Sequence, residues 1–428
     1  MAKYTVYLGS CDSYRSETIF SVLKTAMDHV QLKQPPFGRV VIKPNIVMAH
    51  PGVATDGFTR PEVVEGIVRL VRETGSNVER IDISEASGLG ITTSGGYRWA
   101  GYRRLRKQGV RMRAMEECRR KVVTLEKGRL HKHITVTAEM ADRDFLIFAP
   151  KLKTNVLAHA YTGALKLNIG TVDSKERMLY HDYRLPVKIV DILEAANPDL
   201  IITDGIRFSY GGNQMTQGGI DFGLIAVSTN AVAHDMVCAR LIGLDPFKIE
   251  HIKEAMDRGY GPASFEEIDI AGDYPRDRAA MIVKDLDFGF YPVDRFQSNF
   301  RIVSGTPYCT GGCQGILLDW LHMIRDRKPK LLKRFPRLTV LVGKVTERIE
   351  DRIVLLIGDC ARASTDVTCR RKIVIGGCPP THKRIVWDMM VNLFLLAPLV
   401  RPSLIIDGFV AYPLKKIKGW LVNSGRRA

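Results

Sequence analysis

The spacing of apolar positions predicts strands and helices that alternate along the first half of the chain. Short apolar runs at Tyr4–Leu8, Val40–Ile42 and 79–87 are typical of strands. Between the last two runs, Pro61 begins a segment whose apolar residues recur at helical spacing, and Gly75 ends it. This alternation predicts an α/β fold in which helices cover both faces of a mostly parallel sheet.

The pattern continues downstream. It predicts a helix over 187–197, a strand that ends at Asp204 and Gly205, a flexible glycine-bearing loop over 211–219, and a second strand-to-helix crossing over 223–244. The basic stretch Arg98–Arg113 is predicted to be the solvated side of an amphipathic helix, with its apolar residues facing inward: Tyr102, Leu105 and Val110.

Lysines gather where two predicted strands end. The segment 150–170, PKLKTNVLAHAYTGALKLNIG, follows a short apolar run, and KPN follows Val40–Ile42. Ligands of an open α/β sheet bind beyond the carboxyl ends of its strands, and ammonium groups beside small residues suit an anionic group. The residues expected to bind an anionic substrate are therefore Lys43, Asn45, Lys151, Thr154 and Gly163. A solvated lysine-rich loop is the alternative.

Catalytic groups are expected at the same strand ends. The candidates are Lys153, Lys166, Asp56, Asp204 and Asp235, and the three carboxylates are expected to supply protons. A carboxylate among lysines normally has a lowered pKa, so an acid role requires burial to counter that effect. His234, near the start of a predicted helix, is a candidate base, and a solvated or capping role is its alternative.

The second half of the chain carries cysteines in an unusual arrangement. Apolar runs at 338–343, 352–358 and 372–377 are typical of short strands, and two of them lead directly to Cys360 and Cys378. Cys309 and Cys313 precede an amphipathic segment. If both lie on its helix, their spacing puts them on one face, and the helix start lowers the thiol pKa.

These four cysteines converge if the three strands are parallel. Four thiolates suit a 4Fe–4S cluster or structural zinc, and zinc is disfavoured because Cys360 and Cys378 have no near cysteine neighbour in a zinc knuckle. Cys369 is expected at the wrong end of the last strand. The remaining cysteines are expected to be ordinary thiols: Cys11, Cys118 and Cys238.

The chain carries 63 basic and 46 acidic residues, a formal charge of +17. This charge favours anionic partners, and the absence of interleaved aromatic residues in the basic stretch argues against a specific nucleic-acid groove. No signal peptide is evident, so we expect a cytoplasmic protein with reduced or metal-bound thiols.

The last part of the chain is both apolar and basic. Val386–Val400 is apolar but interrupted by polar residues, and further apolar positions precede a set of lysines and a tryptophan: Lys415, Lys416, Lys418 and Trp420. This composition is typical of an interfacial membrane segment, which would make the protein membrane-associated. A helical hairpin packed on the body or on a homodimer partner is the alternative. The expected units are therefore 1–296, 297–380 and 381–428.

Several of these motifs resemble the domain of unknown function 362 family. VVIKPNIV, TDGFTRPEVVEGIVRLVRE, PKLKT, TGALKLNIG, ITDGI and NAVAHDMVCARLIGL occur in the family's order and cover most of residues 38–260. Members are often iron–sulfur proteins, and Cys309, Cys313, Cys360 and Cys378 look like the cysteine set of members with a compact C-terminal unit. TDGFTRPEVVEGIVRLVRE is also similar to a segment of lactate racemase, but this single segment implies no cofactor.

The first functional hypothesis is an iron–sulfur oxidoreductase. Its cluster passes electrons from an unknown donor to an anionic substrate, for which a membrane-borne isoprenoid or quinone-like molecule is one expectation. The second is a non-redox enzyme that acts on a carboxylate or phosphate and holds structural zinc or a structural cluster. The third is an electron carrier without substrate chemistry.

Overall fold

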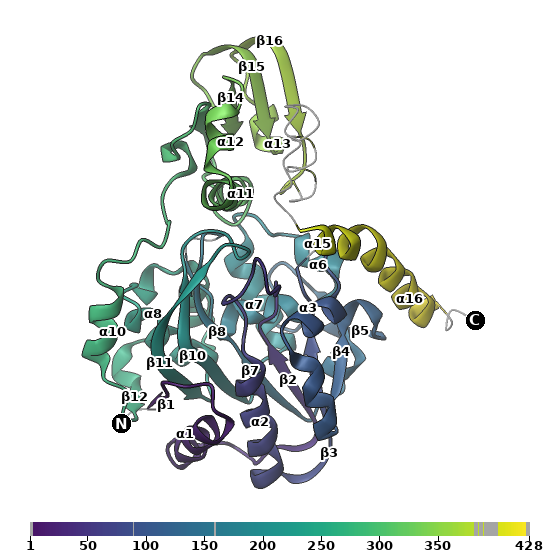
Figure 1. Ribbon diagram of the computed structural model, residues 1–428, viewed down its shortest axis with the longest axis vertical. Helices are drawn as coiled ribbons and strands as arrows, with labels where there is room; N and C mark the ends of the chain where they lie inside the picture. Colours follow the sequence, from purple (N-terminus) through teal and green to yellow (C-terminus); the bar gives the residue numbers. More distant parts are fainter. Residues whose placement is uncertain are drawn as a thin grey trace.

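The computed structural model contains a large sheet flanked by helices, a smaller second sheet beside it, and a C-terminal helix that projects from the side (Figure 1). The structure describes residues 3–88, 90–157, 160–380, 384, 388 and 401–424. The α/β architecture predicted from the apolar pattern is confirmed.

The large sheet has ten strands, and most neighbouring pairs are parallel. Its main path runs through β12 (Ile268–Ala271), β1 (Tyr4–Ser10), β11 (Gly218–Ser228), β10 (Leu200–Tyr210), β7 (Phe145–Ala149), β2 (Phe37–Pro44), β3 (Ser76–Glu85) and β4 (Arg111–Ala114). Two further strands, β8 (Lys151–Asn155) and β9 (Ala160–Tyr161), extend it beyond Pro150. The pairing of β8 with β10 sets Lys151 opposite Asp204 and Lys153 opposite Ser209.

Alternate residues of the central strands face two separate cores. Val40 and Ile42 of β2 pack with the residues of α1 (Ser16–His29) and α2 (Pro61–Thr74). Val41 faces the other side, where α7 (Leu185–Ala195) and α8 (Ala231–Leu241) contribute the core. This two-residue period buries both faces of the sheet, as parallel strands require. The prediction of helices on both faces is therefore confirmed.

Two predictions about the large domain were wrong in detail. β10 does not end at Gly205 but continues to Tyr210, and Gly218 and Gly219 belong to β11 rather than to a loop, because the two strands pair as a long antiparallel hairpin. The stretch 98–113 is not one helix. Gly101 and Gly109, with φ of 80° and 68°, divide it into the end of α3 (Thr93–Trp99), a 3-10 helix η1 (Tyr102–Gln108) and β4. The predicted inward residues Tyr102, Leu105 and Val110 are buried.

The second sheet is fully parallel. It consists of β13 (Arg301–Ser304), β14 (Thr339–Val342), β15 (Ile349–Ile357) and β16 (Val367–Ile375). The three strands expected from the sequence are β14, β15 and β16, and β13 was missed. Helices α11 (Cys313–Arg327) and α12 (Pro329–Arg334) pack against this sheet, and the core they form also contains Val156 and Leu157 of the large domain.

The remaining elements are short. They include a two-stranded sheet of β5 (Arg120–Thr124) and β6 (His133–Thr137) and the helices α4 (Ala138–Ala141), α5 (Ala164–Leu167), α6 (Ser174–Met178), α9 (Glu250–Asp257), α10 (Arg276–Val283) and α13 (Asp359–Arg362). The chain closes with α15 (Pro402–Ile406), a π-helical turn η7 (Asp407–Ala411) and α16 (Tyr412–Ser424). The predicted apolar segment Val386–Val400 lies outside the described residues apart from Asp388. None of the described helices combines the length and the apolar character needed to cross a bilayer.

Candidate functional site

Lys43 is a buried lysine whose charge is compensated. Its Nζ lies 2.5 Å from Glu85 Oε1, and both side chains are about 1% exposed. Glu85 also accepts hydrogen bonds from the backbone amides of Ile46 and Ala86, which fixes the exits of β2 and β3 together. Burial lowers the pKa of Lys43, and the Glu85 carboxylate opposes that shift. Lys43, which was predicted to contact the substrate, thus forms an internal ion pair with Glu85.

Lys151 has the same character. Its Nζ lies 3.0 Å from Asp204 Oδ1 and donates to the Tyr14 hydroxyl at 3.0 Å. The Tyr14 hydroxyl and the Arg60 amide also donate to Asp204, each at 2.9 Å. The predicted proton donor Asp204 is therefore already occupied by three donors, and the pair joins the start of β8 to the middle of β10.

Lys153 differs because no carboxylate contacts it. Its Nζ donates to three neutral acceptors: Asn45 Oδ1 at 3.2 Å, the Gly57 carbonyl at 3.1 Å and Gln214 Oε1 at 3.3 Å. Burial, and then the charges of the neighbouring lysines, lower the pKa of Lys153 to about 7. Lys153 can therefore gain or lose a proton near neutral pH. Asn45, also predicted for this site, is brought into it by this contact.

Lys166 is the second lysine without a carboxylate contact. Its Nζ donates to the Leu157 carbonyl at 3.1 Å, and burial lowers its pKa to about 8. The charge of the Asp319 carboxylate, on α11, opposes this lowering of the Lys166 pKa. That carboxylate accepts a hydrogen bond of 2.6 Å from Asn213 Nδ2, and burial raises the pKa of Asp319 to about 7. Two lysines and one aspartate thus have pKa values within about one unit of neutrality.

Asp319 and Asn213 were missed in the sequence. The signal for Asp319 was present, because it is the lone acidic residue in the apolar run GILLDWLHMI, where an unpaired carboxylate is costly. Asn213 carried no signal, since it lies in a loop whose side-chain directions follow from the long β10–β11 hairpin.

Asp235 holds the backbone that carries Lys166. Its two carboxylate oxygens accept from the amides of Ala164 and Leu165, at 2.8 and 2.9 Å, at the start of α5. A Cβ on Gly163 would lie 2.1 Å from Asp235 Oδ1, so this approach requires glycine. His234 is fully buried and contacts Asp235 Oδ1 at 2.8 Å, so it is neither solvated nor a surface cap. Both residues position α5 in this structure.

Two other predicted residues lie at the edge of the site. Asp56 Oδ1 accepts from Arg207 Nε at 2.9 Å, and this pair is partly exposed. Thr154 is buried, and its hydroxyl accepts from the Gly211 amide at 3.3 Å. Thr154 therefore ties β8 to the β10–β11 turn.

The four predicted cysteine positions come from three separate segments that meet beside the large domain. The β15 and β16 exits are joined by hydrogen bonds from the Gly358 amide to the Ile375 carbonyl and from the Asp359 amide to the Gly377 carbonyl. Cys378 Sγ lies 3.7 Å from Asp182 Oδ2. A Cβ on Gly311 would lie 2.7 Å from the Asp182 carbonyl, so the 309–313 loop approaches the same aspartate.

The glycines of this region leave room for sulfur. A Cβ on Gly358 would lie 2.5 Å from Cys313 Sγ, and a Cβ on Gly312 would lie 2.6 Å from Cys309 Sγ. Gly358 and Gly377 also have φ of 91° and 129°, which other residues rarely adopt. The backbone thus shapes a space around thiols from different segments, and four cysteine sulfurs are a donor set that iron–sulfur clusters use. The residues present fit such a cluster.

Two details of the cysteine prediction were wrong. Helix α11 begins at Cys313, so Cys309 lies in the preceding loop and the two do not share a helical face. The helix start does not lower their pKa values. Burial, followed by the charge of Asp182 for Cys309 and by the neighbouring thiols for Cys313, raises the pKa of both thiols to about 12. Burial and mutual repulsion outweigh the helix terminus here.

The cysteines differ in exposure: Cys309 is buried, Cys313 and Cys360 are half-buried, and Cys378 is exposed. Within the described ranges, no three His, Cys, Asp or Glu side chains form an assembled metal site. Cys369 lies near the start of β16, at the opposite end from Cys378, as expected. Cys11, Cys118 and Cys238 are buried thiols.

A cavity of about 180 Å³ lies beside the cysteine loop. It is lined by Tyr308, Thr310 and Gly311 of that loop and by Asp182 and His251 of the large domain. His251 is 2% exposed and its Nε2 has no hydrogen-bond partner. Burial lowers the pKa of His251 to about 4, and the charge of Lys166 contributes to this shift. The charge of Lys166 thus acts on a residue that lines the cavity.

Comparison with known proteins agrees with the resemblance seen in the motifs. Residues 40–240, which lie in the large α/β domain, match the family model described as "Domain of unknown function (DUF362)". The chain is also similar to the thylakoid-associated protein sll1697 of Synechocystis sp., with 25% identity over 308 residues, which cover 67% of this chain and 90% of that protein.

Two solved structures show distant likeness. The lactate racemase apoprotein from Thermoanaerobacterium thermosaccharolyticum superposes with a TM-score of 0.37 and 10% identity, over 80% of this chain and 69% of that chain. A protein from Thermotoga maritima superposes with a TM-score of 0.32 and 14% identity, over 49% of this chain and 55% of that chain.

Proposed function

We propose that this protein is an iron–sulfur oxidoreductase that reduces an anionic small molecule. Cys309, Cys313, Cys360 and Cys378 would hold a 4Fe–4S cluster, which supplies single electrons when bound. The observation that supports the proposal is the meeting of the cysteine segments beside a cavity that Asp182 and His251 line, with the charge of Lys166 acting on His251.

Helix α11 links the cysteines to the titratable groups. Cys313 is its first residue and Asp319 lies six residues further on, about 9 Å along the helix axis at 1.5 Å per residue. This spacing is short enough to bring electrons and protons to one bound molecule. Cys378, the exposed cysteine, is where an external one-electron carrier protein would approach.

The lysines and Asp319 divide the remaining work. Lys166 would bind the anionic group, and His251, neutral because its pKa is low, would donate or accept a hydrogen bond in the cavity. A two-electron reduction consumes two electrons from the external carrier and two protons. Asp319, with a pKa of about 7, and Lys153, also about 7, are the groups that can release protons at neutral pH.

Anaerobic purification of the full chain tests the cluster. We expect about four iron and four sulfide per chain, absorbance near 400 nm and bleaching by dithionite. Serine at Cys309, Cys313, Cys360 or Cys378 should remove most of the iron, whereas Cys369→Ser should retain it. Cys369 is a matched control because it lies on β16 of the same unit, at the far end from Cys378. Stoichiometric zinc instead of iron, or iron retained by the four variants, would overturn the proposal.

The substrate half of the proposal has a separate test. Small molecules extracted from the purified protein are identified by mass spectrometry, and the Lys166→Met variant is compared with the wild type. We expect an anion that is enriched on the wild type and lost from the variant while the iron content stays unchanged. Equal recovery from both proteins would contradict the assignment of Lys166.

A further inference from the structure

Segment 401–424 docks on the large domain by its polar side. Asp407 accepts from the Thr92 amide and from the Thr92 hydroxyl, each at 2.7 Å. Lys415 and Lys418 form ion pairs with Glu117 at 2.9 and 2.7 Å. Of the alternative, a helical hairpin packed on the body or on a homodimer partner, the described residues show the packing of 401–424 on the body, and these contacts hold it in place.

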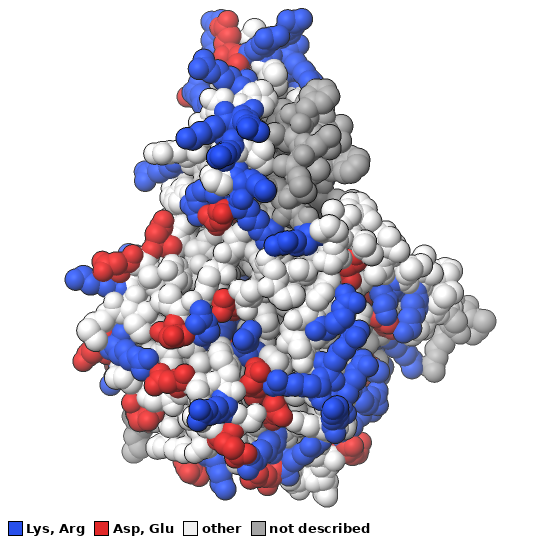
Figure 2. Space-filling view, in the orientation of Figure 1, with Lys and Arg blue, Asp and Glu red and all other residues white. Residues whose placement is uncertain are grey.

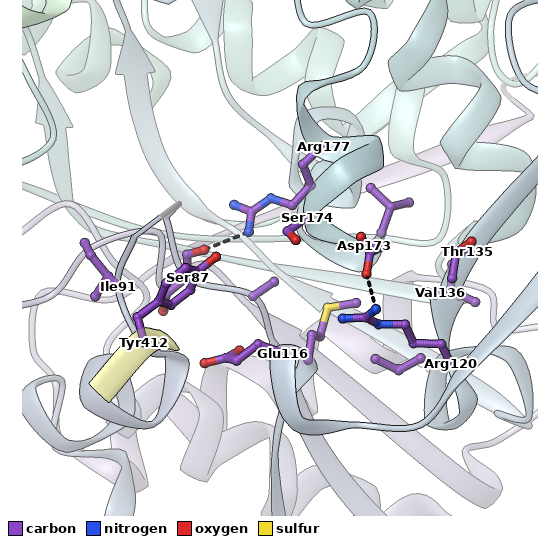
Figure 3. Close-up of a pocket in the computed structure, with 14 residues that line it drawn as sticks. Ser87, Ile91, Glu116, Arg120, Thr135, Val136, Asp173, Ser174, Arg177 and Tyr412 are labelled. Carbon is purple, nitrogen blue, oxygen red and sulfur yellow. Dashed lines mark hydrogen bonds and ion pairs between the residues drawn. The ribbon is translucent and has the colours of Figure 1, made fainter. Parts of the chain in front are cut away.

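Glycines let the helix lie directly on the backbone of the domain. A Cβ on Gly408 would lie 2.7 Å from the Gly90 carbonyl oxygen, and one on Gly419 would lie 1.9 Å from the Glu116 carbonyl oxygen. Positions eleven apart share one helix face, so the small residues form the docked side. Tyr412 of the same segment lies near Ser87 at the edge of a small cavity of about 30 Å³ (Figure 3).

The opposite side of the helix is apolar and faces outward. Ile406 is 61% exposed, Leu414 61% and Trp420 65%. Together with Phe409, Val410 and Ile417 they recur every three or four residues and form one continuous stripe, called here the outer stripe. This is the reverse of an ordinary surface helix, which turns its large apolar residues toward the core. An exposed stripe of this kind marks an interaction surface.

The charges around the outer stripe indicate its partner. The acidic residue of this segment, Asp407, is buried, while Lys416 lies beside the stripe by helical spacing. Figure 2 shows the projecting helix mostly white, with Lys and Arg side chains on the adjoining surface of the domain. A second copy of a chain with a charge of +17 would repel such a surface, whereas anionic lipid headgroups would attract it.

We propose that the outer stripe binds the surface of an anionic membrane. The helix would lie in the headgroup region with Phe409, Leu414 and Trp420 in the acyl boundary and Lys416 on a phosphate. The large domain would stay outside the bilayer, attached through Asp407 and Glu117. This inference stands independently of the cysteine site.

Vesicle sedimentation with the full chain tests the proposal. The probes are phosphatidylcholine vesicles with and without phosphatidylglycerol. We expect binding to the anionic vesicles only, a decrease of at least about tenfold for the triple variant Leu414→Ser, Ile417→Ser, Trp420→Ser, and partial loss for Lys416→Glu. The matched control is Val122→Ser with Met281→Ser, because these residues are 67% and 72% exposed elsewhere on the molecule. The control should bind like the wild type.

Three results would overturn the proposal. The wild type could remain in the supernatant with anionic vesicles, or the triple variant could bind as tightly as the wild type. Light scattering could also reveal a dimer of the wild type that the triple variant converts to a monomer, which would assign the outer stripe to a second copy. The fluorescence of Trp420 is obtained as the difference between the wild type and Trp420→Phe. It should shift to the blue when the protein binds vesicles, and it should not shift for the monomer in solution without vesicles.

Discussion

Four lysines near the strand exits, of which Lys43, Lys151 and Lys153 are buried and Lys166 is half-buried, have different surroundings. Lys43 and Lys151 each contact a buried carboxylate, at 2.5 and 3.0 Å, whereas Lys153 and Lys166 contact only neutral oxygens. Charge compensation is what a structural lysine needs, because an unpaired buried charge is costly. An uncompensated lysine is retained at that cost when it must exchange a proton or attract an anion. The comparison separates the lysines that hold the sheet edge from those that can perform chemistry.

The largest expected effect is on stability. Lys43→Met or Lys151→Met leaves Glu85 or Asp204 as an unpaired buried carboxylate, and we expect each to lower the free energy of unfolding by about 3–5 kcal/mol. Lys153→Met should cost less, because two of its acceptors are side-chain amides that can reorient. Urea unfolding at neutral pH measures all three. The double variant Lys151→Met, Asp204→Asn should recover part of the loss, and an equal cost for Lys151→Met and Lys153→Met would contradict the comparison.

The second effect is on the pH dependence of stability. The pKa of Lys153 is about 7 in the folded chain against 10.5 when unfolded, so the unfolded chain binds more protons between these values and stability rises with pH across that window. The displacement sets an upper limit of about 5 kcal/mol, and after local relaxation we expect about 2–3 kcal/mol from this group. Lys153→Met should flatten the rise measured by urea unfolding from pH 7 to 10. An unchanged slope would show that burial does not lower the pKa of Lys153.

The parallel sheet and the lysine positions followed from local patterns. Apolar runs and the residues at their ends are properties of neighbouring positions, so the exits carrying Lys43, Lys151 and Lys153 could be located from the sequence. Which lysine meets which carboxylate depends on strand order. The pairing of Lys151 with Asp204 requires β8 to lie beside β10, which no local pattern specifies.

The cysteine unit illustrates the same limit. Three of its four strands followed from apolar runs, and the far-end position of Cys369 followed from strand direction. The start of α11 at Cys313 could not be predicted in this way, because it depends on Gly312 and on the contact of the preceding loop with Asp182. Asp319 was visible as a polar residue in an apolar helix, but its placement near Lys166 depends on how α11 packs against the large domain.

The third effect is the acidic counterpart of the second. Burial raises the pKa of Asp319 from 3.8 to about 7, so the folded chain keeps this proton longer and stability falls as pH rises from about 4 to 7. Asp319→Asn should remove about 2 kcal/mol of that fall and leave the alkaline rise of Lys153 in place. Unfolding measured from pH 4 to 7 checks the change. Loss of both limbs together would show that Asp319 and Lys153 titrate as one unit.

The smallest effect is expected at Asp56, which lies outside the comparison of buried lysines and therefore serves as its baseline. Its ion pair with Arg207 has side chains that are 19% and 34% exposed, so water and salt screen it. Asp56→Asn should change the free energy of unfolding by less than about 1 kcal/mol. The same urea titrations measure it. If Asp56→Asn costs as much free energy of unfolding as Lys151→Met, partial exposure to water does not weaken an ion pair at this edge of the sheet. Burial alone could then not distinguish structural lysines from reactive ones.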